Sequence, residues 1–181
     1  MRIFPAILVA MLVVLPPSIA ASSDDALRGL EGVALVVHQV PQHAGISTAE
    51  VTTMAELALR RSGIRILTSD EAIKAPGFPV LYVSVDVGKP KDMQIYSVGI
   101  ELWQLVMLTS NKKLIHATTW STNGGYGVTP RWQIGSSIRE MLEPQLERFC
   151  NEYLKANPHS KPVKRRPAVM DLVDPEPVNA E

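Results

Sequence analysis

Apolar residues follow a strand-like pattern in several segments of the chain. Residues 33–40 form an apolar run in which His38 is the only ionisable residue, which predicts a central strand covered on both faces. In residues 81–87, Leu or Val alternates with a polar or aromatic residue, which is typical of a strand with one buried face. A hairpin turn is expected over residues 110–113, between two long strands. The predicted strands cover residues 33–40, 64–67, 81–87, 95–109 and 114–121.

Two other segments have the 3.6-residue spacing of a long helix. The first begins at a capping box made by Ser47 and Glu50, and Gly63 is expected to end it. The second is expected over residues 131–156, where an apolar stripe continues for several turns. Pro144 is expected to kink this helix or to divide it in two.

The order of these elements predicts the fold. With a brief helix over residues 70–74, the chain reads strand, helix, strand, short helix, three strands, helix. This order predicts an α/β (α+β) two-layer sandwich, in which one mixed sheet of about five strands carries two long helices on one face. The glycine-rich residues 123–127 are expected to form the loop before the last helix. They lack the Gly-Lys-Ser/Thr ending of a phosphate-binding loop.

The two ends of the chain differ from this middle part in composition. Residues 1–20 indicate a signal peptide, because Arg2 precedes an apolar run that ends at a proline pair, and a small-residue cleavage site lies just before Ala21. The run is shorter than the roughly 20 apolar residues of a membrane span. The expected parts are a signal peptide (1–20), an N-terminal segment (21–32), a single α/β domain (33–157) and a disordered Pro-rich charged tail (158–181).

Charge and cysteine content limit the classes of function and the location that fit this chain. The chain has 18 Lys and Arg residues and 18 Asp and Glu residues, whereas nucleic-acid-binding domains carry a marked basic excess. Cys150 is the only cysteine, so an internal disulfide is excluded and no lipidation site follows the signal peptide. Its place on an apolar helix face favours burial over pairing with another chain. Together these features predict a soluble periplasmic or secreted protein.

The element order and the expected export resemble those of small envelope domains, namely the N-terminal domain of TolB and the lipoprotein activators of penicillin-binding proteins. The residues that carry the resemblance are the segments 33–40, 47–67 and 82–120. The resemblance implies the same type of α/β domain, and it implies that the chain acts by binding another envelope protein. It transfers no functional residue, because it rests on element order and not on a motif.

One face of the predicted sheet carries a cluster of aromatic and apolar residues. With the turn at residues 110–113, Trp103 is expected to pair with Trp120, Leu105 with Thr118, and Met107 with His116. If both long helices cover the face of the alternating valines, the opposite face stays open and forms a partner-binding surface. The alternatives are that the terminal segments, the short helix or a homodimer mate covers it. The candidate partner-binding residues are Tyr82, Trp103, Leu105, Met107 and Trp120.

The leading hypothesis is therefore an exported, non-enzymatic protein-binding module of the cell envelope. The alternative is a small periplasmic hydrolase or ligand-binding protein, with an acid–base site formed by His38, His116 and Asp86. We expect no catalytic motif, metal or cofactor, because the four histidines have no metal-ligand spacing and no second cysteine is present. We also expect no nucleic-acid partner and no transmembrane segment in the mature chain.

Overall fold

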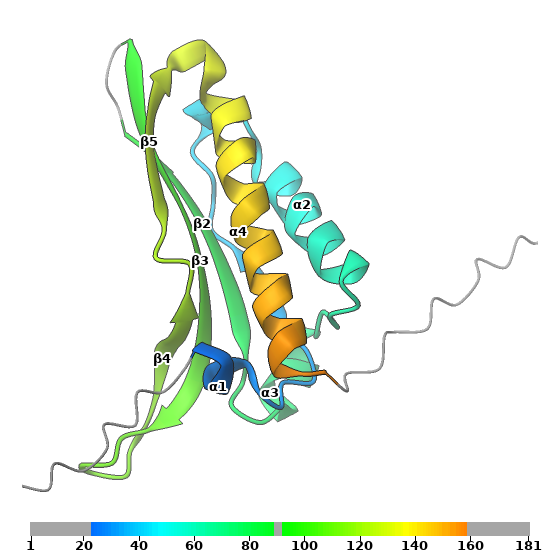
Figure 1. Ribbon diagram of the computed structural model, residues 1–181. Coiled ribbons are helices and arrows are strands. Elements are labelled where there is room, and N and C mark those ends of the chain that lie inside the picture. Colours follow the sequence, from blue (N-terminus) through cyan, green and yellow to red (C-terminus); the bar gives the residue numbers. More distant parts are fainter. Residues whose placement is uncertain (1–22, 89–91, 159–181) are drawn as a thin grey trace, which may run out of the picture.

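A mixed five-stranded sheet forms one layer of the protein and two long helices form the other (Figure 1). The computed structural model describes residues 23–88 and 92–158. In the order β1-β2-β3-β4, β1 runs parallel to β2 and the other pairs are antiparallel, while β5 pairs with β3. This confirms the predicted fold class. The strands are β1 (Ala34–Val37), β2 (Val80–Val87), β3 (Met93–Met107), β4 (Leu114–Ser121) and β5 (Gly125–Pro130).

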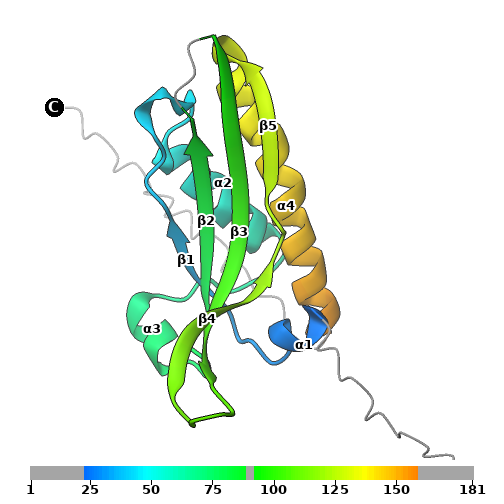
Figure 2. The ribbon, with the colours of Figure 1, turned by 90° about the vertical axis from the view of Figure 1, so that its left-hand side faces the viewer.

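Both long helices cover the same face of the sheet. Figure 1 shows α2 and α4 on one side, and Figure 2 shows the opposite face of the sheet with no helix in front of it. The covered face is the one formed by the alternating Leu and Val residues of β2 and by the buried apolar residues of β3. The helices are α1 (Ser23–Leu27), α2 (Thr48–Arg61), α3 (Ser69–Lys74) and α4 (Ile134–Ala156), with single 3-10 turns η1 (Gln42–Ala44) and η2 (Arg131–Gln133).

Helix α2 begins and ends at the residues that the sequence predicts. The Ser47 hydroxyl accepts from the Glu50 amide at 3.2 Å, and the Glu50 carboxylate accepts from the Ser47 amide at 2.9 Å. The Arg139 guanidinium also donates to the Glu50 carboxylate at 2.8 Å. Together these bonds lower the pKa of Glu50 to about 2. At the other end Gly63 has a φ of 73°, and the amide of Ile64 donates to Leu59 O, as in a glycine-terminated helix.

Helix α4 continues through Pro144 without a break. The predicted division of this helix into two is therefore wrong. Proline removes the bond to the carbonyl four residues earlier, here that of Glu140. Both Pro144 and Glu140 are exposed, so solvent can satisfy that carbonyl, while Leu142 and Leu146 on the inner face hold the helix on the sheet.

Two strand predictions need correction. The run at residues 33–40 is not a central strand, because β1 spans only Ala34–Val37 and lies at the edge of the sheet. One face of β1 is not covered by the helices, and Val36 on that face is 37% exposed. The strand expected over residues 64–67 is reduced to one bridge between Val33 and Ile66.

The glycine-rich residues 123–127 are only partly a loop, because β5 begins at Gly125. β5 pairs with the first half of β3, whereas β4 pairs with the second half, so the two strands follow each other along one edge. Gly127 has to be glycine there, since a Cβ atom would overlap the Tyr96 ring. The signal peptide (1–20) and, apart from Pro158, the tail (158–181) lie outside the described residues.

Candidate partner-binding site

An irregularity between β3 and β4 decides which residues face away from the helices. Trp103 pairs with Thr118 and Leu105 with His116, but Leu102 pairs with Trp120. One additional residue, Thr119, therefore lies on β4 between the two registers, as in a β-bulge. Such an insertion moves the following side chains to the other face of the sheet. The predicted pairings of Trp103 with Trp120, Leu105 with Thr118 and Met107 with His116 are wrong, because each partner on β4 lies two residues earlier than the expected turn at residues 110–113 implies. The bulge then places Trp120 beside Leu102, on the other face of the sheet.

Trp120 consequently belongs to the core and not to the open face. Its side chain is 4% exposed and meets the Phe149 ring of α4 at 5.1 Å, edge to face. Its indole Nε1 donates to Glu152 Oε2 at 2.6 Å. Because the ring lies under α4, it cannot contact a partner, and we remove it from the candidate site.

The other four candidate residues lie together on the open face, and we call this cluster the Trp103 patch. The Tyr82 and Trp103 rings meet edge to face at 5.4 Å, while Leu105 is 39% and Met107 is 59% exposed. The register adds two neighbours from β4. The Trp103 patch is thus Tyr82, Trp103, Leu105, Met107, Leu114 and His116.

Hydrogen bonds hold the largest ring of the Trp103 patch in place. The Trp103 indole Nε1 donates to Glu101 Oε2 at 2.7 Å, and the Thr118 hydroxyl donates to the same oxygen at 3.2 Å. Glu101 is thereby oriented by two neighbours on adjacent strands. A fixed aromatic ring loses little conformational entropy on binding, which favours its use as an anchor.

A second apolar cluster lies on the same face, at the β5 end of the sheet, and sequence reasoning missed it. Ile95 pairs with Val128 and Ser97 with Tyr126, and the Tyr126 side chain is 83% exposed. The sequence carried a signal for this cluster, because Tyr126 and Val128 alternate with small or polar residues. The glycines on either side of Tyr126 concealed it as a loop. We call this cluster the Tyr126 patch; it comprises Met93, Ile95, Tyr126 and Val128.

A polar hollow of about 360 Å³ separates the two patches. Asp86 and Glu101 supply its carboxylates, and the strand positions between them carry serine and glycine. Neither lysine nor arginine lines it in the described part of the chain. The residues that matter here are Ser84, Asp86, Ser97, Glu101, Ser121 and Asn123.

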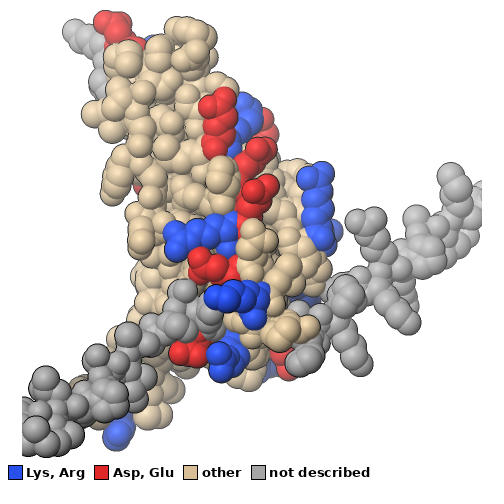
Figure 3. Space-filling model, in the orientation of Figure 1, with Lys and Arg blue, Asp and Glu red and all other residues tan. Residues whose placement is uncertain are grey.

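The helix layer has a different character from this face. In Figure 3, acidic and basic side chains gather over α4 and α2 with both signs interspersed. Several of them pair along or between the helices, as Arg148 does with Glu152 at 2.8 Å and Arg139 with Glu50 at 2.8 Å. Such mixed surfaces are ordinary solvated faces.

His38, His116 and Asp86 do not form one site. The His38 ring lies against the Tyr82 ring, with 5.8 Å between their centroids, and the His116 ring lies against the Phe78 ring, with 4.9 Å between theirs. Asp86 pairs with Ser97 of β3, whereas His116 pairs with Leu105 of the same strand. These two β3 residues are eight positions apart, which is about 26 Å at the rise of a strand. Within the described residues, no three His, Cys, Asp or Glu side chains are grouped so as to hold a metal ion.

Cys150 is buried, as predicted. Its thiol lies 3.7 Å from the carbonyl oxygen of Ala58 in α2, and burial raises the pKa of the thiol. It therefore links the two helices by packing and offers no reactive thiolate.

No protein-family model matches the chain, and no curated protein or solved structure is significantly similar to it. No helix in the described residues is both long enough and apolar enough to cross a membrane.

Proposed function

We propose that this chain is an exported, soluble, non-enzymatic module that binds another protein of the cell envelope through the open face of its sheet. The single observation that carries the proposal is the position of the helices. Both long helices cover the valine face, which leaves the Trp103 patch without a covering element in the described chain. The signal peptide indicated by residues 1–20 supplies the expected location.

The composition of the Trp103 patch supports a protein partner. Tryptophan and tyrosine are enriched among the residues that dominate binding energy at protein interfaces. Trp103 and Tyr82 are both half-buried and in contact with each other, so each ring is already positioned before a partner arrives. Leu105 and Met107 extend the apolar surface along β3.

The charge of the face specifies the chemistry of the partner. The hollow beside the Trp103 patch contains Asp86 and Glu101 and lacks a basic lining residue among those described. A partner that places an apolar segment on the patch and a Lys or Arg side chain over the hollow would complement it. The same face disfavours partners with an acidic contact surface.

Site-specific photo-crosslinking tests this proposal with a matched control. Leu105 and Leu154 are both 39% exposed, but Leu105 lies on the open face and Leu154 on α4. A photoreactive amino acid at position 105 should form an adduct with an envelope protein, and the same amino acid at position 154 should not. The purified partner should then bind the Trp103→Ala variant at least about tenfold more weakly, as expected for an anchor residue.

Three outcomes of this experiment would contradict the proposal. The first is an adduct of equal yield from both positions, and the second is no adduct from position 105. The third is an adduct between two copies of this chain, which would make the open face a homodimer interface. Circular dichroism of the Trp103→Ala variant controls for folding.

A further inference from the structure

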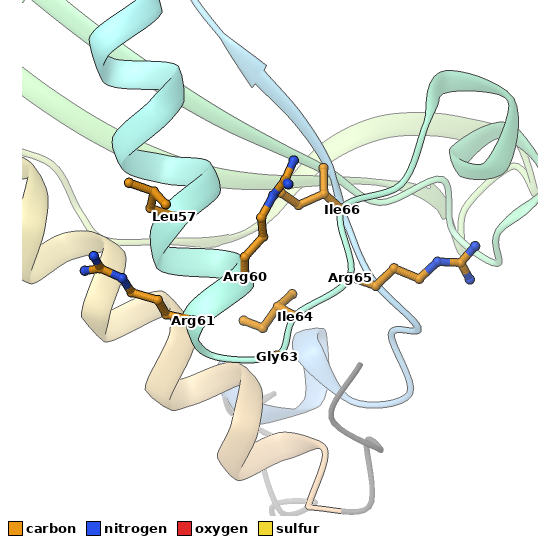
Figure 4. Close-up of a pocket in the computed structure, with 7 residues that line it drawn as sticks. All are labelled: Leu57, Arg60, Arg61, Gly63, Ile64, Arg65 and Ile66. Carbon is orange, nitrogen blue, oxygen red and sulfur yellow. The ribbon is translucent and has the colours of Figure 1, made fainter. Parts of the chain in front are cut away.

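A second groove lies on the other side of the sheet, where α2 ends beside the edge strand β1 (Figure 4). Its volume is about 510 Å³. Leu57 and Ile66 give it apolar walls, and the bridge between Val33 and Ile66 places it directly against the edge of the sheet. The lining residues that the argument uses are Leu57, Arg60, Arg61, Ile64, Arg65 and Ile66.

The edge of β1 beside this groove has backbone groups without strand partners. The amides of Ala34 and His38 donate toward β2, to Pro79 O at 3.0 Å and Val83 O at 2.9 Å. Because amides alternate along a strand, those of Leu35 and Val37 point to the opposite edge. At that edge, the backbone of the described residues 65–67 exchanges hydrogen bonds with Val33, and no hydrogen bond joins it to Leu35 or Val37. An extended segment can add to such an edge.

The groove is basic. In Figure 4 the Arg60 side chain extends toward Ile66, while Arg61 and Arg65 lie on either side of the groove. Arg60 pairs with Glu56 at 2.9 Å and Arg65 pairs with Glu71. Arg61 makes no ion pair with a described residue. A segment that fits should therefore be apolar along one face and acidic at one end.

We propose that residues 168–174 of this chain's own C-terminal tail occupy the groove as an additional strand on the edge of β1. Alternate positions of the segment carry Ala168, Met170, Leu172 and then Asp174. In a strand these four side chains share one face, so Met170 and Leu172 pack on Leu57 and Ile66 while Asp174 meets the arginines. Prolines 167 and 175 bracket the segment and none lies within it, so every amide that points toward β1 is available to donate to its edge.

The tail is long enough to reach the groove. Cys150 of α4 lies 3.7 Å from the carbonyl oxygen of Ala58, close to the end of α2. From Cys150 to Ala156, where α4 ends, the helix rises about 9 Å. The ten residues 159–168 span up to about 33 Å when extended. The segment can therefore turn back to the groove of its own chain.

Disulfide cross-linking in the full chain tests the pairing and its strand register. Leu57 is 46% exposed, so Leu57→Cys should not disturb the core. The pair Leu57→Cys with Leu172→Cys should oxidise at least about tenfold faster than Leu57→Cys with Val173→Cys, because only residue 172 faces the groove and intramolecular contact raises the effective concentration. Asp174→Lys should slow the first pair. Leu57→Cys alone controls for pairing with the buried Cys150.

The products separate this proposal from its alternatives on a non-reducing gel. The proposal expects a fast-migrating monomer whose formation does not depend on protein concentration. Equal rates for positions 172 and 173, or no cross-link, would overturn the strand arrangement. A disulfide-linked dimer would assign the groove to a second copy of the chain and would overturn the intramolecular docking. None of these outcomes depends on the Trp103 patch, so the proposed function is tested separately.

Discussion

Replacement of Trp120 with alanine should destabilise the domain strongly, whereas replacement of Trp103 should not. The two tryptophans lie on neighbouring strands but on opposite faces, because Thr119 is inserted between the two registers of β3 and β4. Trp120 packs under α4 against Phe149, and Trp103 lies on the open face. The pair is therefore a direct test of the bulge.

The structure gives the size of the effect. Truncation of a buried tryptophan to alanine removes apolar contacts and leaves a cavity, which together reduce the free energy of unfolding by about 3–5 kcal/mol. The hydrogen bond from Trp120 to the Glu152 carboxylate adds to this loss, since bonds to charged groups contribute about 1.5–3 kcal/mol. Trp120→Phe keeps an aromatic ring beside Phe149 and removes this bond with only part of the buried indole, so it should have the smaller effect.

Urea denaturation followed by far-ultraviolet circular dichroism measures these differences. For Trp120→Ala we expect a lower midpoint at unchanged slope, and a melting temperature lower by about 10–20 °C for a domain of this size. Trp103→Ala should change the free energy of unfolding by less than about 1.5 kcal/mol, since its ring is half exposed. Equal losses for Trp103→Ala and Trp120→Ala would refute the bulge and the assignment of the two faces.

Three further predictions concern the packing of the helices and strands. Gly127→Ala should lower the free energy of unfolding by about 1–3 kcal/mol through overlap with the Tyr96 ring, and Tyr96→Leu should relieve part of this loss in the double variant. Glu50→Gln should be less stable than the original chain above pH 4.5, and by urea denaturation this difference should disappear as the pH falls from 4.5 toward 2, because the pKa of Glu50 is lowered to about 2 by folding. Cys150 should react with a thiol reagent slowly in the native protein and rapidly in guanidinium, because burial raises the pKa of its thiol; a rate equal to that of a free thiol in native buffer would contradict its place between the helices.

The sequence predicted those elements that local chemistry determines. The capping box at Ser47 and Glu50, the glycine after α2 and the alternating residues of β2 each depend on a few neighbours in the chain. The layer arrangement followed from them, because two amphipathic helices and a half-buried sheet have few ways to bury their apolar faces.

Errors arose where a distant contact decides the outcome. Trp120 changes face because of one inserted residue, and nothing in the residues around Thr119 marks that insertion. The run at residues 33–40 resembles a central strand by composition, but its neighbours are set by the crossover to β2. The glycines at positions 125 and 127 predict a loop by composition, but they lie in a strand, where Met141 and Tyr96 approach the backbone too closely for a side chain.

The end of the β3–β4 hairpin strengthens the case for a partner on the open face. Figure 1 shows this hairpin extending beyond the helices, and adjacent residues that point to opposite faces, Leu114 and Ile115, are both exposed. Lys112 and Lys113 at the turn limit pairing with other strands, but they lie beyond the apolar positions and do not cover them. Exposed apolar surface of this kind promotes aggregation unless another molecule covers it. A partner bound to the Trp103 patch would cover Leu114 as well. The same exposed apolar residues would then supply the binding energy and be protected from aggregation.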